Sequence, residues 1–217
     1  DPQPIFEAHA EFGRRLPKST EPRPRWQPLQ PGERLKVGYV SGDFVRHSVS
    51  YFIGALLEHH DTRRFDVTCY NNLGWGDSTT ARLKSYGHRW VECEGLTDDQ
   101  LRRRIQADGI HLLIDLAGHT SHSRASMFGL GVAPVQLTYL GYPTVNGVAA
   151  NDFRITDAVI DPLPSDQPAH PAEQPLRLTR SMFCYRPDEH PPVAPPPSLQ
   201  AGFVTFGSFN NIAKVSD

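Results

Sequence analysis

Several residues suited to chemistry lie in a loop that follows a short apolar run near the start of the sequence. The loop Ser41–Ser48 contains Gly42, which permits a tight turn, and His47, which precedes a candidate helix cap at Ser48. An imidazole at a strand-to-helix junction can act as a general base or hold a substrate hydroxyl. A local hydrogen bond that only fixes the loop explains His47 equally well, so both roles stay open.

Two further loops could line the same site. The loop Asp115–Ser123 is small and rich in hydroxyl groups, and its backbone N–H groups suit an anion or a sugar. In the loop Tyr139–Gly147, Gly141 would let the backbone approach a ligand closely and Pro143 would hold the turn rigid. This last loop also fits a plain surface turn. His88, near the start of an apolar run, fits a core or edge histidine better than a ligand.

Other kinds of site are poorly supported. A metal ligand set would have to use Asp115, His119 and His122, but their spacing matches no closed zinc pattern, so we expect no metal and interpret His122 as a solvated residue at a helix start. The sequence lacks the G-x-G-x-x-G run of dinucleotide-binding proteins and the G-x-S-x-G elbow of serine hydrolases. The basic run Arg102–Arg104 is offset by nearby aspartates and predicts a solvated helix face.

Short apolar runs alternate with amphipathic stretches, a pattern typical of a parallel sheet with crossover helices. The expected strands are Leu35–Val40, Phe65–Tyr70, His88–Glu92, Ile110–Asp115 and Val135–Thr138, with further strands at Phe153–Thr156 and Leu176–Thr179. The expected helices are Val49–His60, Thr79–Tyr86, Thr97–Ala107 and Ser123–Phe128. In such a sheet, ligands bind at the carboxyl ends of the strands, where the loops above would meet.

The ends of this region are rich in proline. An amphipathic helix is expected at Ile5–Leu16, followed by a proline-rich connector, so we divide the chain into residues 1–32 and a sheet domain of residues 33–217. Proline-rich loops are also expected at Asp161–Pro175 and Pro187–Pro197.

Composition limits the class of protein. The 217 residues include 22 basic and 24 acidic side chains, so the formal net charge of −2 argues against a nucleic-acid-binding protein or one that binds anionic membranes. No apolar run is long enough for a transmembrane helix. The three cysteines are widely spaced and fit reduced thiols in a cytoplasmic protein.

Several segments in the same order resemble the amino-terminal catalytic lobe of the O-linked N-acetylglucosamine transferase family. They are Leu35–Phe44 with Arg46 and His47, Gly109–Leu116 with Gly118, His119 and Thr120, Ala133–Gln136, Leu140–Pro143, and Phe209–Asn211 with Lys214. The resemblance therefore extends from Leu35 to Lys214.

This resemblance implies an α/β fold, with a Rossmann-like parallel sheet and flanking helices, that forms one lobe of a GT-B glycosyltransferase. The family is inverting and metal-independent, needs no cofactor, and moves N-acetylglucosamine from UDP-N-acetylglucosamine to serine or threonine hydroxyls of proteins. The expected partners are the acceptor protein or peptide, the carboxy-terminal catalytic lobe and preceding tetratricopeptide repeats. Because the second lobe binds most of the nucleotide, residues 1–217 alone are expected to be inactive.

The resemblance also assigns residues to the site. His47 matches a cleft histidine that acts as a base or positions a substrate, and it is the candidate catalytic residue. The candidate substrate-binding residues are His88, Gly118, His119, Thr120, Leu140, Gly141, Tyr142 and Pro143. Two alternatives remain open, namely a UDP-sugar epimerase lobe and a non-catalytic Rossmann-like interaction module.

Overall fold

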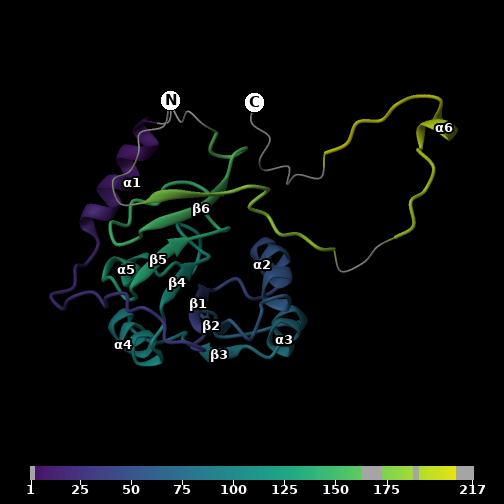
Figure 1. The fold of residues 1–217 in the computed structure, drawn as a ribbon. Helices are drawn as coiled ribbons and strands as arrows, with labels where there is room; N and C mark the ends of the chain where they lie inside the picture. The colour runs from purple at the N-terminus through teal and green to yellow at the C-terminus, as the bar shows by residue number, and fades with distance from the viewer. Residues whose placement is uncertain (1–2, 163–172, 188–190, 209–217) are drawn as a thin grey trace. The chain divides into compact units, whose positions relative to one another are not determined.

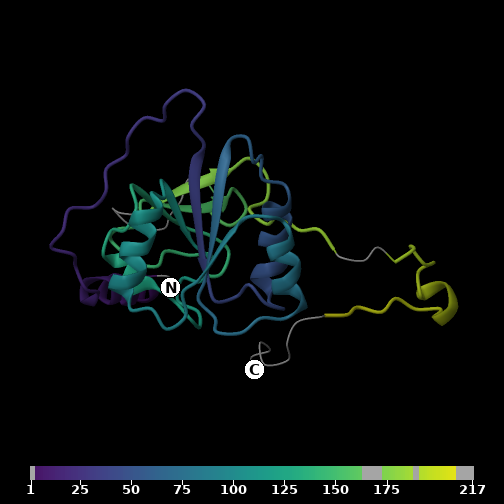
Figure 2. The ribbon, with the colours of Figure 1, turned by 90° about the horizontal axis from the view of Figure 1, so that it is seen from below.

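The computed structural model describes residues 3–162, 173–187 and 191–208. The chain divides into two compact units, Asp1–Arg186 and Pro187–Asp217. The first unit is an α/β layer structure in which helices cover both faces of one sheet (Figures 1 and 2). In the described part of the second unit, the one helix is α6 (Ser198–Ala201).

The sheet has seven strands in the order β3-β2-β1-β4-β5-β6-β7, and all neighbouring pairs are parallel. The strands are β1 (Leu35–Ser41), β2 (Phe65–Asn71), β3 (Arg89–Glu92), β4 (Leu112–Asp115), β5 (Val135–Thr138), β6 (Phe153–Asp157) and β7 (Gln174–Leu178). The strand order reverses direction between β1 and β4, which places a topological switch point at their carboxyl ends. The predicted α/β Rossmann-like lobe is confirmed.

The other helices are α1 (Gln3–Arg15), α2 (Ser48–Glu58), α3 (Ser78–Ser85), α4 (Asp98–Asp108) and α5 (Ala125–Gly129). Capping side chains explain where several of them begin. A capping box of Thr97 and Gln100 starts α4, and Gly109, with φ of 67°, ends it in the left-handed conformation that glycine adopts easily. A second capping box, formed by Asp77 and Thr80, starts α3. These local signals fix the lengths of the crossover helices.

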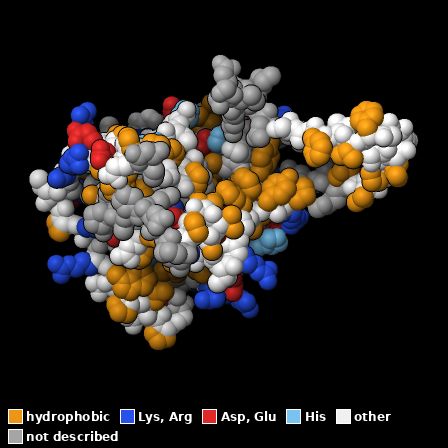
Figure 3. All heavy atoms as spheres, turned by 90° about the horizontal axis from the view of Figure 1, so that it is seen from above, with side chains coloured by type: hydrophobic (Ala, Val, Ile, Leu, Met, Phe, Trp, Pro, Cys, Tyr) orange, Lys and Arg blue, Asp and Glu red, His pale blue; other side chains and the backbone are white. Residues whose placement is uncertain are grey.

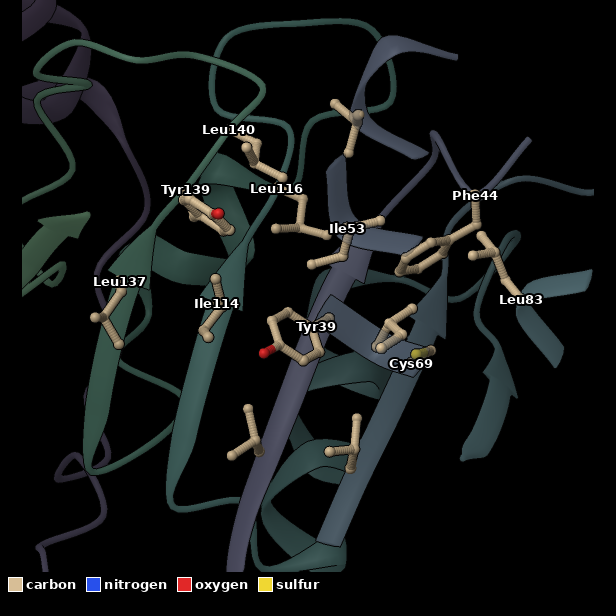
Figure 4. Close-up of a cluster of buried hydrophobic side chains, with 14 of the residues drawn as sticks. Tyr39, Phe44, Ile53, Cys69, Leu83, Ile114, Leu116, Leu137, Tyr139 and Leu140 are labelled. Atoms are coloured by element: carbon tan, nitrogen blue, oxygen red, sulfur yellow. The ribbon is translucent and has the colours of Figure 1, made fainter. Parts of the chain in front are cut away.

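Two apolar clusters lie on opposite faces of the sheet, because successive side chains of a strand point to opposite sides. Figure 4 shows the first cluster, in which Tyr39, Ile114 and Leu137 come from neighbouring strands and Ile53 comes from α2. On the other face, Leu113 packs with residues of α4 and α5 such as Ile105 and Phe128. The helices therefore bury both faces of the sheet and leave its carboxyl edge to the loops.

The connector before β1 packs against the sheet unit. Arg23 pairs with Asp152 and donates a hydrogen bond from Nε to the carbonyl oxygen of Ala133 at 2.8 Å. The burial of Arg102 in α4 contradicts the prediction that Arg102–Arg104 form a solvated helix face. Its side chain is only 6% exposed and forms ion pairs with Glu21 of the connector at 2.7 Å and with Asp99 at 2.9 Å.

The expected elements are present with ends that differ by no more than two residues, as frayed ends usually do. Differences of two residues include β4, which begins at Leu112 rather than Ile110, and α5, which begins at Ala125 rather than Ser123. The structure also corrects the helix cap at α2. Ser48 is the first helical residue, and the N-cap is His47.

Most of the predicted loop Asp161–Pro175 lies outside the described residues, as do Phe209–Asn211 and Lys214. Among the helices that the structure describes, none is long and apolar enough to cross a membrane. On the face shown in Figure 3, lysine and arginine side chains are scattered, and several lie beside acidic ones.

Candidate functional site

The carboxyl ends of β1, β4 and β5 lie side by side, because β4 pairs with β1 on one side and with β5 on the other. The loops that follow these three strands carry every predicted site residue except His88. The structure therefore gathers residues that are far apart in the sequence at the edge where ligands bind in open α/β sheets. We call this edge the switch-point site.

His47 stands at the start of α2 in this site, and its side chain is 42% exposed. Its Nδ1 atom accepts a hydrogen bond from the backbone N–H of Val49 at 3.3 Å. In a neutral imidazole only one nitrogen can accept, so this contact assigns the ring proton to Nε2. Neutral His47 therefore has one remaining hydrogen-bonding group, the Nε2–H donor.

Asp43 lies beside His47 in the same loop. Its Oδ2 atom is 3.7 Å from Nδ1 of His47, and it is buried without a hydrogen-bond partner in the described part of the chain. Burial raises the pKa of Asp43, while His47 and His122 act in the opposite direction. The loop is held by two hydrogen bonds, from Asp43 N to Ser41 Oγ and from Ser50 Oγ to the Asp43 carbonyl.

A second carboxyl group, Asp115, ends β4 at the switch point. Its two oxygens accept hydrogen bonds from the backbone N–H groups of Ala117 at 2.9 Å and Gly118 at 3.2 Å. Burial raises its pKa to about 6, although these two bonds favour the charged form. Asp115 thus shapes the loop after β4, and sequence analysis considered it only as a metal ligand.

The loop after β4 is a tight turn. Gly118 adopts φ of 57°, and a Cβ atom there would lie 2.4 Å from Cβ of Tyr142, so only glycine fits. The Thr120 hydroxyl donates to the carbonyl of Ala117 at 2.8 Å. This turn brings Gly118 against Tyr142 of the loop that follows β5.

That neighbouring loop is equally constrained. Leu140 is a buried, non-glycine residue with φ of 66°, a conformation that is costly for a branched side chain. A Cβ atom at Gly141 would lie 2.1 Å from the carbonyl oxygen of Leu116. Gly141 therefore permits the close approach of two loops, and strained backbone of this kind is common at functional sites.

His119 and Tyr142 contact helix α1 as well as one another. The Nε2 atom of His119 donates to the carbonyl of Asn146 at 2.7 Å, and its ring lies 4.8 Å from that of His9 and 4.7 Å from that of Phe12. The hydroxyl of Tyr142 is hydrogen-bonded to His9 at 2.7 Å. These two side chains help dock α1 on the sheet unit.

His88 lies apart from the other predicted residues. It precedes β3, so it stands at the amino edge of the sheet, and its Nε2 atom donates to the carbonyl of Leu57 at 2.6 Å. Its ring is 5.8 Å from that of His60. The structure therefore does not bring His88 together with His47.

Sequence analysis missed the residues that tie the loops together. The Arg124 guanidinium donates to Asn72 Oδ1, to the carbonyls of Cys93 and Leu96, and to Asp98. Asn72 in turn donates to the carbonyl of His122 at 2.9 Å. An arginine just before a helix gives no motif by itself. Its partners come from the loop after β2, the loop after β3 and the start of α4, so no local signal could have identified it.

Among the described residues, no group of three or more histidine, cysteine or acidic side chains is arranged to hold a metal ion. The side chains of Asp115 and His119 instead form the hydrogen bonds with backbone groups described above. What the switch-point site does offer is an Nε2–H donor, a buried carboxyl group beside it, and a strained loop pair. Such a set can orient a hydroxyl group and a sugar.

Comparison with known proteins gives a consistent result. Residues 22–179 match the family model described as glycosyl transferase family 41. Over 98% of its length, the chain is 39% identical to the tomato (Solanum lycopersicum) protein named probable UDP-N-acetylglucosamine–peptide N-acetylglucosaminyltransferase SPINDLY, of which it covers 23%. It is 36% identical over 137 residues to the Caenorhabditis elegans UDP-N-acetylglucosamine–peptide N-acetylglucosaminyltransferase, which covers 62% of the chain and 12% of the relative.

A solved structure agrees with these sequence matches. An O-GlcNAc transferase mutant of Thermobaculum terrenum matches with a TM-score of 0.81 and 33% identity, over 90% of this chain and 38% of the other. The chain thus spans about a quarter of the length of its curated SPINDLY relatives from tomato and Arabidopsis thaliana.

Proposed function

Because this chain belongs to glycosyl transferase family 41, we propose that it forms the amino-terminal lobe of a GT-B enzyme that glycosylates proteins. The proposed donor is UDP-N-acetylglucosamine, and the proposed acceptors are serine and threonine hydroxyls. The names of the relatives from tomato and Caenorhabditis elegans support this choice. The observation that carries it is the meeting of His47 with the two constrained loops at the carboxyl ends of β1, β4 and β5.

The proposed reaction is a direct displacement with inversion. The acceptor hydroxyl oxygen forms a bond to the anomeric carbon, the bond between that carbon and the diphosphate oxygen breaks, and UDP leaves. The hydroxyl proton passes to a base, and the departing diphosphate needs compensation of its negative charge. The sequence holds neither an Asp-x-Asp motif nor a glycine-rich phosphate loop. We therefore assign diphosphate binding to the second lobe and propose no resident metal or cofactor.

We assign His47 to positioning a substrate oxygen rather than to accepting the proton. The N–H of Val49 already occupies Nδ1, so neutral His47 presents a donor at Nε2 and has no free basic nitrogen. Gly118, Thr120, Leu140, Gly141 and Pro143 are proposed to shape the wall of the sugar pocket. His119 and Tyr142 are proposed to support that wall from behind, through α1.

The remaining parts of the proposal concern what lies outside this lobe. A carboxy-terminal lobe and tetratricopeptide repeats are proposed for the whole protein, since the chain covers only 38% of its solved relative. Residues 1–217 alone are proposed to lack turnover. We propose a cytoplasmic location, which the unpaired Cys69, Cys93 and Cys184 support.

The test is an assay of the complete protein with UDP-N-acetylglucosamine and a peptide that contains serine and threonine. The proposal expects a glycosylated peptide and released UDP in equal amounts. Release of an epimerised sugar without peptide modification would favour the epimerase alternative. Binding of a protein partner with no sugar product from any nucleotide sugar would favour the non-catalytic module.

A further inference from the structure

A pocket lies at the same edge of the sheet, beside the switch-point site. It has a volume of about 340 Å³ and lies at the carboxyl ends of β2 and β3. Its lining consists of Asn71, Leu73, Gly74, Trp75, Gly76, Thr80, Lys84, Glu92 and Glu94. We call it the β2–β3 pocket, and neither the sequence motifs nor the proposed reaction uses it.

Two side chains of this pocket have unused hydrogen-bond acceptors. Asn71 is 3% exposed, and its Oδ1 atom is buried without a partner, whereas its Nδ2 atom donates to Leu73 O and Glu92. The exposed carboxylate of Glu94 has neither an ion pair nor a hydrogen bond assigned within the described part of the chain. A ligand that fits these two groups must therefore bring N–H or O–H donors.

Two side chains that line or flank the pocket already donate to Glu92. Lys84 Nζ donates to Glu92 Oε1 at 2.8 Å, and the indole N–H of Trp90 donates to the same oxygen at 2.8 Å. The two carboxylates outnumber the one ammonium group, so the pocket also favours positive charge.

Trp75 completes the pocket with an aromatic face. Its side chain is 61% exposed, although tryptophan is usually largely buried. A guanidinium group is planar, carries five N–H donors, stacks on aromatic rings and pairs with carboxylates. It would satisfy Asn71, Glu94 and Trp75 together, which a single ammonium point charge does less well.

The pocket adjoins the switch-point site through the backbone of β2. Asn71 lines the pocket, and the next residue, Asn72, donates to the carbonyl of His122 in the site. Two strand spacings separate β1 from β3, which is roughly 10 Å, or about three residues of extended peptide. The backbone N–H of Arg46, next to His47, also donates to Asp77, which follows Gly76 of the pocket, so an extended peptide whose hydroxyl lies at His47 can place a side chain in the pocket.

We propose that the β2–β3 pocket binds an arginine side chain located about three residues from the modified hydroxyl of the acceptor peptide. The position of the arginine rests on the proposed function, but its binding can be measured without any transfer. The pocket then selects among serine and threonine residues by their neighbours.

The test measures binding of fluorescent peptides to the complete protein without a donor. In a series of peptides, each contains one serine and one arginine, and the arginine moves by one position from each peptide to the next. A matched version of each peptide carries citrulline in place of arginine, because citrulline has a similar shape but no charge. We expect the best arginine peptide to bind at least tenfold more tightly than its citrulline partner. Glu94→Gln and Trp75→Ala should each reduce this ratio to about threefold or less.

Matched controls lie at the other end of the chain's first strand. Glu33→Gln and Trp26→Ala remove an exposed carboxylate and an exposed indole outside the pocket, and should leave the ratio unchanged. Glu94→Arg should bind a peptide in which glutamate replaces arginine more tightly than the arginine peptide. This reversal tests charge recognition by the pocket even if the Trp75→Ala variant does not fold. Equal binding of arginine and citrulline peptides, or an unchanged ratio in Glu94→Gln, would overturn the proposal. The proposal would also be overturned if free N-acetylglucosamine displaces the peptide from the wild-type protein and this displacement is lost in Trp75→Ala.

A transfer assay with the same peptides separates the two proposals. If all peptides are glycosylated but arginine and citrulline are equivalent in binding and transfer, the pocket proposal fails and the proposed function stands. If no peptide is glycosylated and the binding ratio depends on Glu94, the proposed function fails and the pocket still recognises arginine.

Discussion

Oδ2 of Asp43 lies 3.7 Å from Nδ1 of His47, and Nδ1 is occupied by the N–H of Val49 at 3.3 Å. The two contacts need different protonation states of the His47 ring at Nδ1. Neutral His47 accepts from Val49, whereas protonated His47 would turn Nδ1–H toward the carboxylate. The structural cap and the proposed substrate contact therefore meet in one side chain, and substitutions must separate them.

His47→Ala and His47→Asn separate the two roles of this residue. Alanine removes the helix cap, which costs about 1 kcal/mol, whereas asparagine is a good N-cap and should preserve stability. If Nε2 positions a substrate, both variants should lose on the order of 100-fold in kcat/KM in the complete protein. Thermal denaturation and steady-state kinetics check the two effects. Full activity in His47→Asn would show that capping is the whole contribution of His47.

Asp115 should make stability depend on pH. Because burial raises its pKa from 3.8 to about 6, the folded protein binds this proton more tightly than the unfolded chain does. The stability from Asp115 is therefore full below pH 4 and is lost as pH rises to about 6, by an amount on the order of 3 kcal/mol. The difference in unfolding free energy between wild type and Asp115→Asn should fall over this range and then level off. A difference that is constant from pH 4 to pH 7 would contradict the assignment.

Gly141→Ala should disrupt the two loops of the sugar pocket. The added Cβ would meet the Leu116 carbonyl oxygen at 2.1 Å, and backbone cannot give way as a flexible side chain can. We expect a loss of about 1–3 kcal/mol and a raised KM for the donor. Gly54→Ala in α2 is the control, because its Cβ would meet Leu83 at an ordinary 3.5 Å. Equal behaviour of the two variants in thermal denaturation and kinetics would refute the role of Gly141.

His119→Ala should loosen α1, because it removes the rings' contacts with His9 and Phe12 and the hydrogen bond to Asn146. We expect faster cleavage by trypsin after Arg25 of the connector, measured by mass spectrometry. Ser121→Ala, an exposed change in the same loop, is the control. If cleavage is unchanged while the donor KM rises, His119 contacts substrate instead of supporting the pocket wall.

The sheet could be predicted from sequence because its signals are local. The apolar runs that became β1 and β2 begin where expected, and the capping residues of α4 lie within four positions. The site loops followed from the rule that ligands bind beyond the carboxyl ends of parallel strands. The same rule places His88, which precedes β3, at the opposite edge of the sheet, although the resemblance assigned it to the site.

Other features depend on contacts between distant segments. The burial of Arg102 requires Glu21, which is 81 positions away, and the docking of His119 requires α1. The cap at α2 was assigned to Ser48 because serine is a common cap, but the backbone turn places His47 at that position. Sequence periodicity contains no information about these pairings.

The central claim is that this lobe belongs to an enzyme that transfers N-acetylglucosamine to protein hydroxyls. The most direct measurement is mass spectrometry of a serine- and threonine-containing peptide after incubation with the complete protein and UDP-N-acetylglucosamine, alongside other nucleotide sugars. We predict one added N-acetylglucosamine per modified hydroxyl, with strongly reduced modification by His47→Ala. An unmodified peptide, or modification only with a different nucleotide sugar, would contradict the claim.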